Sequence, residues 1–216
     1  MNEKVKNFVD AFEKELPKFL RLCYMTPGKE LQVEASERLT FCKDQIAKIK
    51  EEELVDQDDD AVSAAVSLEK IIDVLNYELM MWIALKEDRT SQAWEDLITA
   101  QYSLPDALSA HEMASSFENY ANHLLALGRV LFHPQTFLSA GLVVGSRICS
   151  ICGQEYDDCD HIKGRLYKGK FCVTELRDVQ AGEVSFVNDP ASKRHRVLTF
   201  TEDGVTKDSL TLRKTP

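Results

Sequence analysis

The chain has no long apolar run, no leader-like segment and no low-complexity tract. Its longest apolar run, Leu79 to Leu85, has seven residues, whereas a helix that crosses a bilayer needs about 20. The first six residues alternate in charge where a signal peptide needs an uninterrupted apolar segment. Without low-complexity sequence there is no compositional signature of disorder. We therefore expect a folded cytoplasmic protein with no membrane segment.

Complete catalytic motifs are also missing. His111-Glu112 begins the zinc-protease pattern, but Ser115 stands where the second histidine is required. The acidic stretch 56–60 lacks the glycine and the later glutamate of a calcium-binding loop, so we interpret it as a solvated linker and helix start. These gaps favour a protein without enzymatic activity. A hydrolase whose residues are assembled from several helices is the lesser alternative.

The net charge of −10 is unevenly distributed along the 216 residues. Residues 1–144 carry −11 and residues 145–216 carry +1. An acidic amino-terminal part repels the phosphate backbone, so generic nucleic-acid binding by that part is disfavoured. A chain of this length can form one large or two small domains, and we expect two.

The first of these domains, residues 1–135, is predicted to be an acidic helical bundle. Apolar residues recur there at steps of three and four, which indicates amphipathic helices. We expect helices near 5–23, 30–53, 61–86, 91–104 and 106–132, with the third at the centre. Pro17 predicts a kink or a break into two helices, Pro105 a second break, and Thr90 or Ser91 an N-cap. Short links favour antiparallel neighbours in an up-and-down arrangement.

The second predicted domain, residues 136–216, is small and mostly β. After His133-Pro134 the helical period gives way to short runs rich in β-branched residues, at 142–144, 171–176, 184–187, 196–201 and 205–212. Glu202-Asp203-Gly204 has the composition of a hairpin turn. So few short strands can bury only a small apolar core, and a bound metal would compensate for the stability that such a core lacks. The fold class is thus α+β, an antiparallel bundle followed by a zinc-stapled β domain.

Four of the six cysteines and one of the five histidines fall within the 24 residues from Cys149 to Cys172. In a reducing compartment such clustering indicates a metal rather than disulfides. Cys149 and Cys152 form a Cys-x-x-Cys pair, which supplies two zinc ligands from one turn. The other two ligands come from Cys159, His161 and Cys172, with His161 preferred and the two cysteines nearly equal. More ligands than a tetrahedral ion needs favour a structural Zn²⁺ over a catalytic one.

Two basic stripes accompany the cysteines. The first comprises Lys163, Arg165, Lys168 and Lys170, and the second runs from Lys193 to Arg196. Both could meet phosphate or an acidic partner. A solvated rim around the metal site is the preferred interpretation.

The cysteine segment also carries a resemblance. Cys149-Ser-Ile-Cys-Gly, Cys159-Asp-His-Ile-Lys-Gly, Tyr167-x-Gly, Cys172 and the stretch 183–191 together resemble a cysteine-rich carboxy-terminal module of phage-related proteins, among them relatives of capsid-assembly and head-maturation proteases. The resemblance covers about 45 residues and implies a zinc-bearing β module in a phage or bacterial genomic-island context. It does not imply protease chemistry, because Ser185 lies in a predicted strand without a matching nucleophile motif.

The combined expectation is a non-enzymatic zinc-binding adaptor or subunit that mediates protein–protein interaction, in a phage or antiphage-defence assembly. The alternative is a nucleic-acid-associated zinc module that uses the basic stripes around Lys163–Lys170 and Lys193–Arg196. Protein partners are expected and nucleic acid is the second choice.

Overall fold

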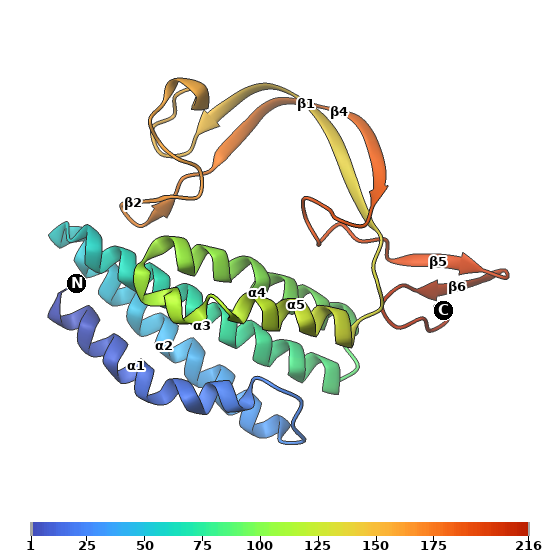
Figure 1. Cartoon of the computed structure of the whole chain (residues 1–216), viewed down its shortest axis with the longest axis horizontal. Coiled ribbons are helices and arrows are strands. Elements are labelled where there is room, and N and C mark those ends of the chain that lie inside the picture. The colour runs from blue at the N-terminus through green and yellow to red at the C-terminus, as the bar shows by residue number, and fades with distance from the viewer. Residues whose placement is uncertain (1, 216) are drawn as a thin grey trace. The chain divides into compact units, whose positions relative to one another are not determined.

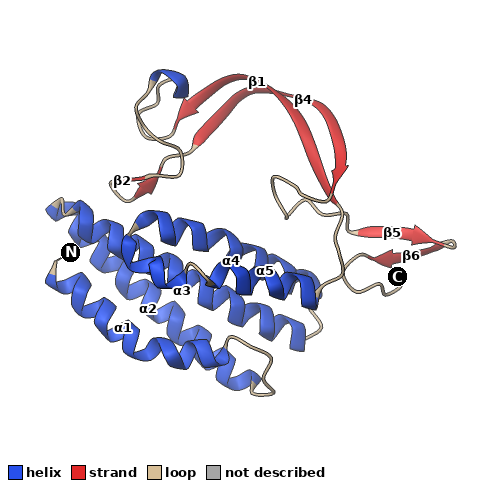
Figure 2. Ribbon diagram, viewed as in Figure 1, coloured by secondary structure: helices blue, strands red, loops and turns tan. Residues whose placement is uncertain are grey.

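The computed structural model describes residues 2–215, which divide into two compact units. The first unit contains the residues up to Leu125 together with Gly164–Phe171, and the second contains Ala126–Lys163 and the residues from Cys172 onward. Figure 2 shows that helix dominates the first part of the chain and strand the last part. The predicted change from helix to strand falls between Leu131 and Phe137, and the domain boundary at residue 135 stays a prediction.

The first unit is a helical bundle, which confirms the predicted fold class. Its elements are α1 (Glu3–Leu22), α2 (Lys29–Asp56), α3 (Asp59–Lys86), α4 (Thr90–Ala110), the 3-10 helix η1 (Glu112–Phe117) and the first half of α5 (Tyr120–Leu131), which continues into the second unit from Ala126. Figure 1 shows the first four running side by side. No helix of the described residues is long and apolar enough to cross a membrane.

Helix α3 lies at the centre of the bundle, as the sequence predicts. Seventeen of its 28 residues are buried. Those with no more than 1% exposure include Val62, Leu68, Ile72, Leu75, Leu79 and Met81. Asp58 is the N-cap of this helix, and its side chain accepts a hydrogen bond from the backbone N–H of Ala61. The acidic link before α3 thus serves as a helix start, because a carboxylate satisfies an unpaired N–H there.

Neither proline ends a helix. Pro17 lies inside the continuous α1 and Pro105 inside the continuous α4, so a break at either proline is wrong, while the alternative of a kink at Pro17 stays a prediction. Both prolines are exposed, while Phe19 and Ala107 nearby are buried against the core. Packing of the buried face offsets the hydrogen bond that each proline removes. The predicted cap is wrong as well, since the N-cap of α4 is Arg89, whose side chain makes no capping hydrogen bond.

The second unit is dominated by a long two-stranded ribbon in place of several short strands. Strand β1 (Phe137–Cys149) pairs antiparallel with β4 (Thr174–Val187), and the register shifts between Gly141 and Leu142. Figure 1 shows the two strands curving together. The glycines divide the apolar sequence into short runs, and for this reason the sequence predicted separate short strands.

A short hairpin completes the second unit. Strands β5 (Thr199–Glu202) and β6 (Val205–Asp208) are joined by Asp203 and Gly204, both with positive φ, as a type I′ turn requires. The predicted hairpin turn is therefore confirmed. A separate pair, β2 (Leu166–Tyr167) with β3 (Lys170–Phe171), belongs to the first unit, and the 3-10 helix η2 (Tyr156–Asp158) belongs to the second.

Candidate metal centre

The first two candidate ligands lie in a tight turn at the end of β1. Cys149 is the last residue of that strand, and its carbonyl accepts a hydrogen bond of 2.9 Å from the N–H of Gly153. The Cys149 N–H donates to the Gln154 carbonyl, also at 2.9 Å. Gly153 has φ of +73°, a conformation that glycine adopts without strain. The backbone therefore folds around the position between the two cysteines.

In the same turn, a backbone N–H group points at the sulfur atom of Cys149. The N–H of Ile151 lies 3.4 Å from the Cys149 Sγ. A hydrogen bond to the charged form of an acid stabilises that form, so this contact favours a thiolate. Thiolate is the form in which cysteine binds metal.

The next two candidates follow η2 in an extended segment. Cys159 has φ of −120° and ψ of 152°, and residues two apart in such a backbone point to the same side. His161 therefore shares a side with Cys159, as predicted. The loop is fixed by the Tyr156 hydroxyl, which accepts a hydrogen bond of 2.9 Å from the Lys163 N–H.

Four ligand atoms converge in this region. Those of Cys149, Cys152, Cys159 and His161 all lie within 4.8 Å of one another. Three thiols and one imidazole at such separations form a Cys3His group that could hold a metal ion such as zinc. Within the described residues no other group of three or more such side chains comes together.

Cys172 lies beside this group but is not part of it. Its Sγ is 3.8 Å from that of Cys149, and two thiolates on one tetrahedral zinc are about 3.8 Å apart when each bond is about 2.3 Å. Ser150 holds the segment in place, since its N–H donates to the Val173 carbonyl at 3.0 Å and its hydroxyl accepts from the Val173 N–H at 2.9 Å. The choice of four ligands among five candidates stays a prediction.

The thiols influence one another electrostatically. Desolvation opposes ionisation of Cys149, but hydrogen bonds from the backbone of Cys152 and Ile151 lower its pKa to about 6. Desolvation and the neighbouring Cys149 thiolate raise the pKa of Cys159 to about 11, and they also raise the pKa of Cys172. Like charges at close range prevent all the thiols from ionising together. A bound cation would remove that restriction, which is the electrostatic reason for such clusters to hold metal.

The basic stripes are only partly available at the surface. Lys163, Arg165, Lys168 and Lys170 are exposed. Arg196 of the second stripe is buried, and it donates a hydrogen bond of 3.0 Å to the Ser209 hydroxyl. This second stripe therefore loses one of its predicted phosphate contacts.

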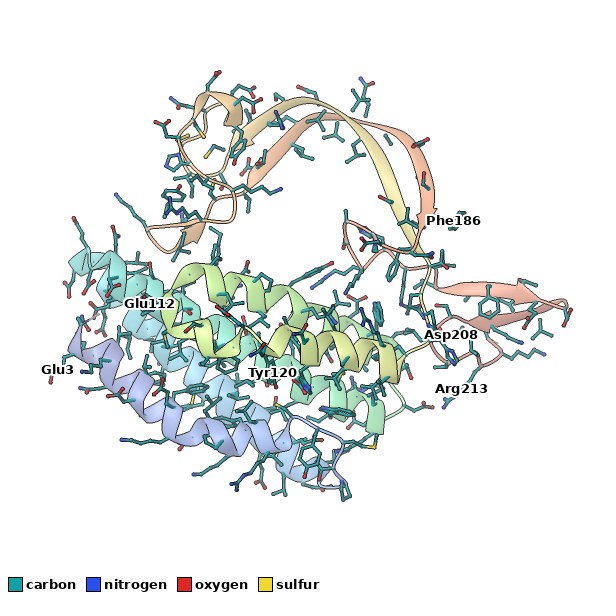
Figure 3. All side chains as sticks on the ribbon, viewed as in Figure 1. Glu3, Glu112, Tyr120, Phe186, Asp208 and Arg213 are labelled. Carbon is teal, nitrogen blue, oxygen red and sulfur yellow. The ribbon has the colours of Figure 1, made fainter. Side chains whose placement is uncertain are left out.

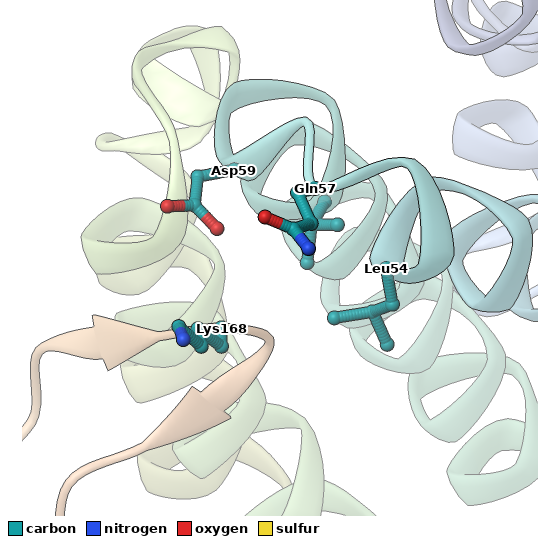
Figure 4. A pocket seen from close by; sticks show the side chains of 5 residues that line it. Leu54, Gln57, Asp59 and Lys168 are labelled. Atoms are coloured by element: carbon teal, nitrogen blue, oxygen red, sulfur yellow. The ribbon is translucent and has the colours of Figure 1, made fainter.

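A small cavity lies in the first unit where the β2–β3 turn meets the link between α2 and α3. It has a volume of about 260 Å³ and is lined by Leu54, Gln57, Asp59, Val62 and Lys168. Figure 4 shows the Lys168 and Asp59 side chains on opposite sides of it. A ligand cavity usually holds 300–1,000 Å³, so this one is too small for most substrates.

The bundle contains a buried polar cluster that the sequence did not predict. The Glu78 side chain is fully buried in α3, and it accepts hydrogen bonds from the Tyr120 hydroxyl at 2.7 Å and from the His123 Nε2 at 2.8 Å. Its hydrogen bond with Glu78 raises the pKa of His123, and burial raises that of Tyr120. A glutamate between Leu75 and Leu79 on an apolar helix face was the signal, because a buried carboxylate needs partners.

Comparison of the chain with protein-family models, with curated proteins and with solved structures finds no match. No family is thereby identified. The resemblance of residues 149–191 to a phage-related module stays a prediction.

Proposed function

We propose that the chain is a non-enzymatic interaction subunit in which a structural Zn²⁺ holds the β-rich region together. One observation carries the structural role: four ligand atoms converge within 4.8 Å, and a fifth sulfur lies 3.8 Å from one of them. A catalytic zinc keeps one position open for water. Here the protein supplies enough ligands to fill all four positions.

The thin core of the β-rich region supports the same role. After Leu131 the buried apolar residues of the second unit are Phe132, Phe137, Cys149, Cys172 and Leu210. Two of these five are candidate ligands. A region with so few buried side chains gains most from a metal, because zinc binding contributes about 10 to 16 kcal/mol in small zinc-finger peptides.

The interaction role is supported by apolar side chains that the region leaves exposed, such as Phe186 at 73% and Val184 at 63%. The resemblance of the cysteine segment to phage-related modules supports an assembly of phage or antiphage defence as the setting. Elemental analysis of protein purified under reducing conditions tests the metal, and we expect one zinc per chain. Protein without metal would contradict the proposal, as would cleavage of peptide or nucleic acid that a point substitution abolishes.

Affinity capture from the native host tests the interaction role. Wild-type protein is expected to retain a defined partner, and the Cys149→Ser variant is expected to lose it because the β-rich region unfolds. Cys42→Ser, at a half-buried position on α2 outside the cluster, is the matched control. Equal capture by all three proteins would place the partner on the bundle and contradict a role for the metal region.

The exposed first stripe supports nucleic-acid binding as the second candidate function. The double variant Lys168→Glu/Lys170→Glu should then abolish salt-dependent binding to DNA or RNA. Lys14→Glu/Lys18→Glu, which makes the same charge change on the exposed side of α1, is the control. Equal effects of the two double variants would reflect net charge alone.

A further inference from the structure

The β1–β4 ribbon has one continuous apolar face. Side chains alternate between the two faces along each strand, and residues opposite each other in the register share a face. Leu138 pairs with Phe186, and Leu142 pairs with Ala181. The face defined in this way, called here the apolar ribbon face, comprises Leu138, Ala140, Leu142, Val144, Val179, Ala181, Val184 and Phe186.

The register shift preserves this face along the ribbon. Gly141 pairs with Glu183 and Leu142 with Ala181, which leaves Gly182 as an extra residue of β4. A bulge of one residue keeps the apolar positions of β4 on one side despite the change in spacing. The opposite face is mixed: its middle carries Ser139, Arg147, Asp178, Gln180, Glu183 and Ser185 beside Val143 and Leu176, and its ends carry Phe137, Val187 and Cys149.

The apolar ribbon face is uncovered. Phe186 is 73% exposed, Val184 63% and Leu142 47%. Figure 3 shows Phe186 projecting away from β4. A two-stranded ribbon is marginally stable in water unless another layer packs on its apolar face. Contiguous exposed apolar surface of this kind marks an interaction site.

The apolar ribbon face carries little net charge, which favours a partner that meets it with an uncharged surface. The one pair of charges at its end, Glu175 and Arg177, forms an ion pair of 3.9 Å and cancels. A second copy of a chain with net charge −10 therefore meets no like charge on this face. A partner that binds through an acidic or basic surface would find no complementary charge there, whereas a second copy would meet it with the same apolar face.

Size and shape also fit a second copy. The exposed parts of the apolar ribbon face amount to on the order of 600 Å² per chain, against roughly 800 Å² per partner in a standard interface. Two ribbons of equal length packed face to face form a four-stranded, two-layer sandwich with layers about 10 Å apart. This is the smallest arrangement that gives each ribbon its missing layer.

We propose that the apolar ribbon face is a self-association surface on which a second copy of the chain packs. This inference rests on the proposed interaction function and names its partner. Interfaces of this size lie at the weak end of the specific range, so the dimer is expected to dissociate on dilution.

Sedimentation velocity of the full chain over a wide range of concentration tests the proposal. The ribbon offers a matched pair, since Val184 lies on the apolar ribbon face and Val143 on the opposite face, at 63% and 65% exposure. Val184→Lys is expected to weaken the dimer at least tenfold, whereas Val143→Lys is expected to sediment as the wild type. Phe186→Ser, which changes the most exposed side chain of the face, provides a second variant with little effect on folding.

A wild-type protein that stays monomeric at every concentration would overturn the inference. So would equal weakening by Val143→Lys and Val184→Lys, because the two faces would then not differ. Zinc content is measured on the same samples. A monomer that contains zinc would contradict self-association and leave the proposed function intact. A protein without metal would contradict the proposed function itself.

Discussion

The helical bundle and the β-rich region bury very different amounts of apolar surface. Helix α3 alone buries fourteen apolar residues, whereas the described residues of the second unit beyond Leu131 include five buried apolar side chains, two of them cysteines. Close packing stabilises the first region by itself, since each buried aliphatic side chain contributes about 1.5 to 3 kcal/mol. The second region depends on strand pairing and, in our proposal, on metal and partner. One chain thus combines two sources of stability that respond to different perturbations.

Removing the proposed metal ligands should have the largest effect on this contrast. Cys149→Ser/Cys152→Ser is expected to unfold the β-rich region and leave the bundle helical, because zinc binding supplies about 10 to 16 kcal/mol in small zinc modules. Zinc analysis and limited proteolysis measure the result. Cys42→Ser is the control, and a double variant that keeps both its zinc and its protease resistance would contradict the account.

Single substitutions decide which cysteine stays off the metal. Cys159 belongs to the convergent group and Cys172 does not, so Cys159→Ser should lower zinc affinity at least ~100-fold and Cys172→Ser much less. Competition with a chromophoric chelator measures both affinities. The reverse order would assign the fourth position to Cys172, whose sulfur already lies 3.8 Å from that of Cys149.

A core substitution in α3 tests the stability of the helical bundle, the first of the two regions compared. Leu75 is fully buried, and Leu75→Ala should cost about 2 to 5 kcal/mol of bundle stability through lost burial and a cavity. Urea unfolding followed by helical circular dichroism measures the loss, and the zinc content should not change. Leu31→Ala, at 55% exposure on α2, is the control. Equal losses for the two variants would contradict the assigned core.

Two glycines of the ribbon provide a smaller test. A Cβ at Gly145 would lie 2.8 Å from the Asp178 Cβ, while one at Gly182 would lie 3.4 Å from the Gly141 carbonyl oxygen. Overpacking of this kind costs about 1 to 3 kcal/mol, so Gly145→Ala should lower the protection of ribbon amides from exchange. Gly182→Ala should lower it less, and a larger effect at Gly182 would show that the strand register differs.

The smallest predicted effect is a pH dependence confined to the bundle. Glu78 raises the pKa of His123 above its ordinary value of 6.5. The protonated histidine therefore stabilises the fold below about pH 6.5, and this contribution disappears as the pH rises through the raised pKa. Melting temperatures of the wild type should fall slightly over that interval. His123→Gln should abolish the slope and His133→Gln, at an exposed position, should retain it.

The sequence predicted what depends on local pattern. The helical period placed α1, α2 and α3 within a few residues, and the Cys-x-x-Cys spacing located the Cys/His group that could hold a metal. The breaks at Pro17 and Pro105 were wrong because burial of the opposite helix face outweighs a local penalty. The ribbon could not be predicted at full length, since Phe137 pairs with Val187 across fifty residues and no local signal encodes that distance.

The polar cluster was hidden for the same reason. Tyr120 and His123 are more than forty residues from Glu78 in the sequence, and only the tertiary fold brings them within hydrogen-bonding distance. The glutamate itself stood out only as a charge inside an apolar stripe. Spacing likewise could not distinguish Cys159 from Cys172, because it allows either to reach the ion, and the choice between them stays a prediction.

Hydrogen exchange with and without a metal chelator tests the central claim most directly. If zinc holds the β-rich region together, chelation should remove protection from the amides of β1 and β4 while those of α1 to α4 stay protected. Unchanged protection in both regions, in protein shown to have lost its metal, would contradict the account.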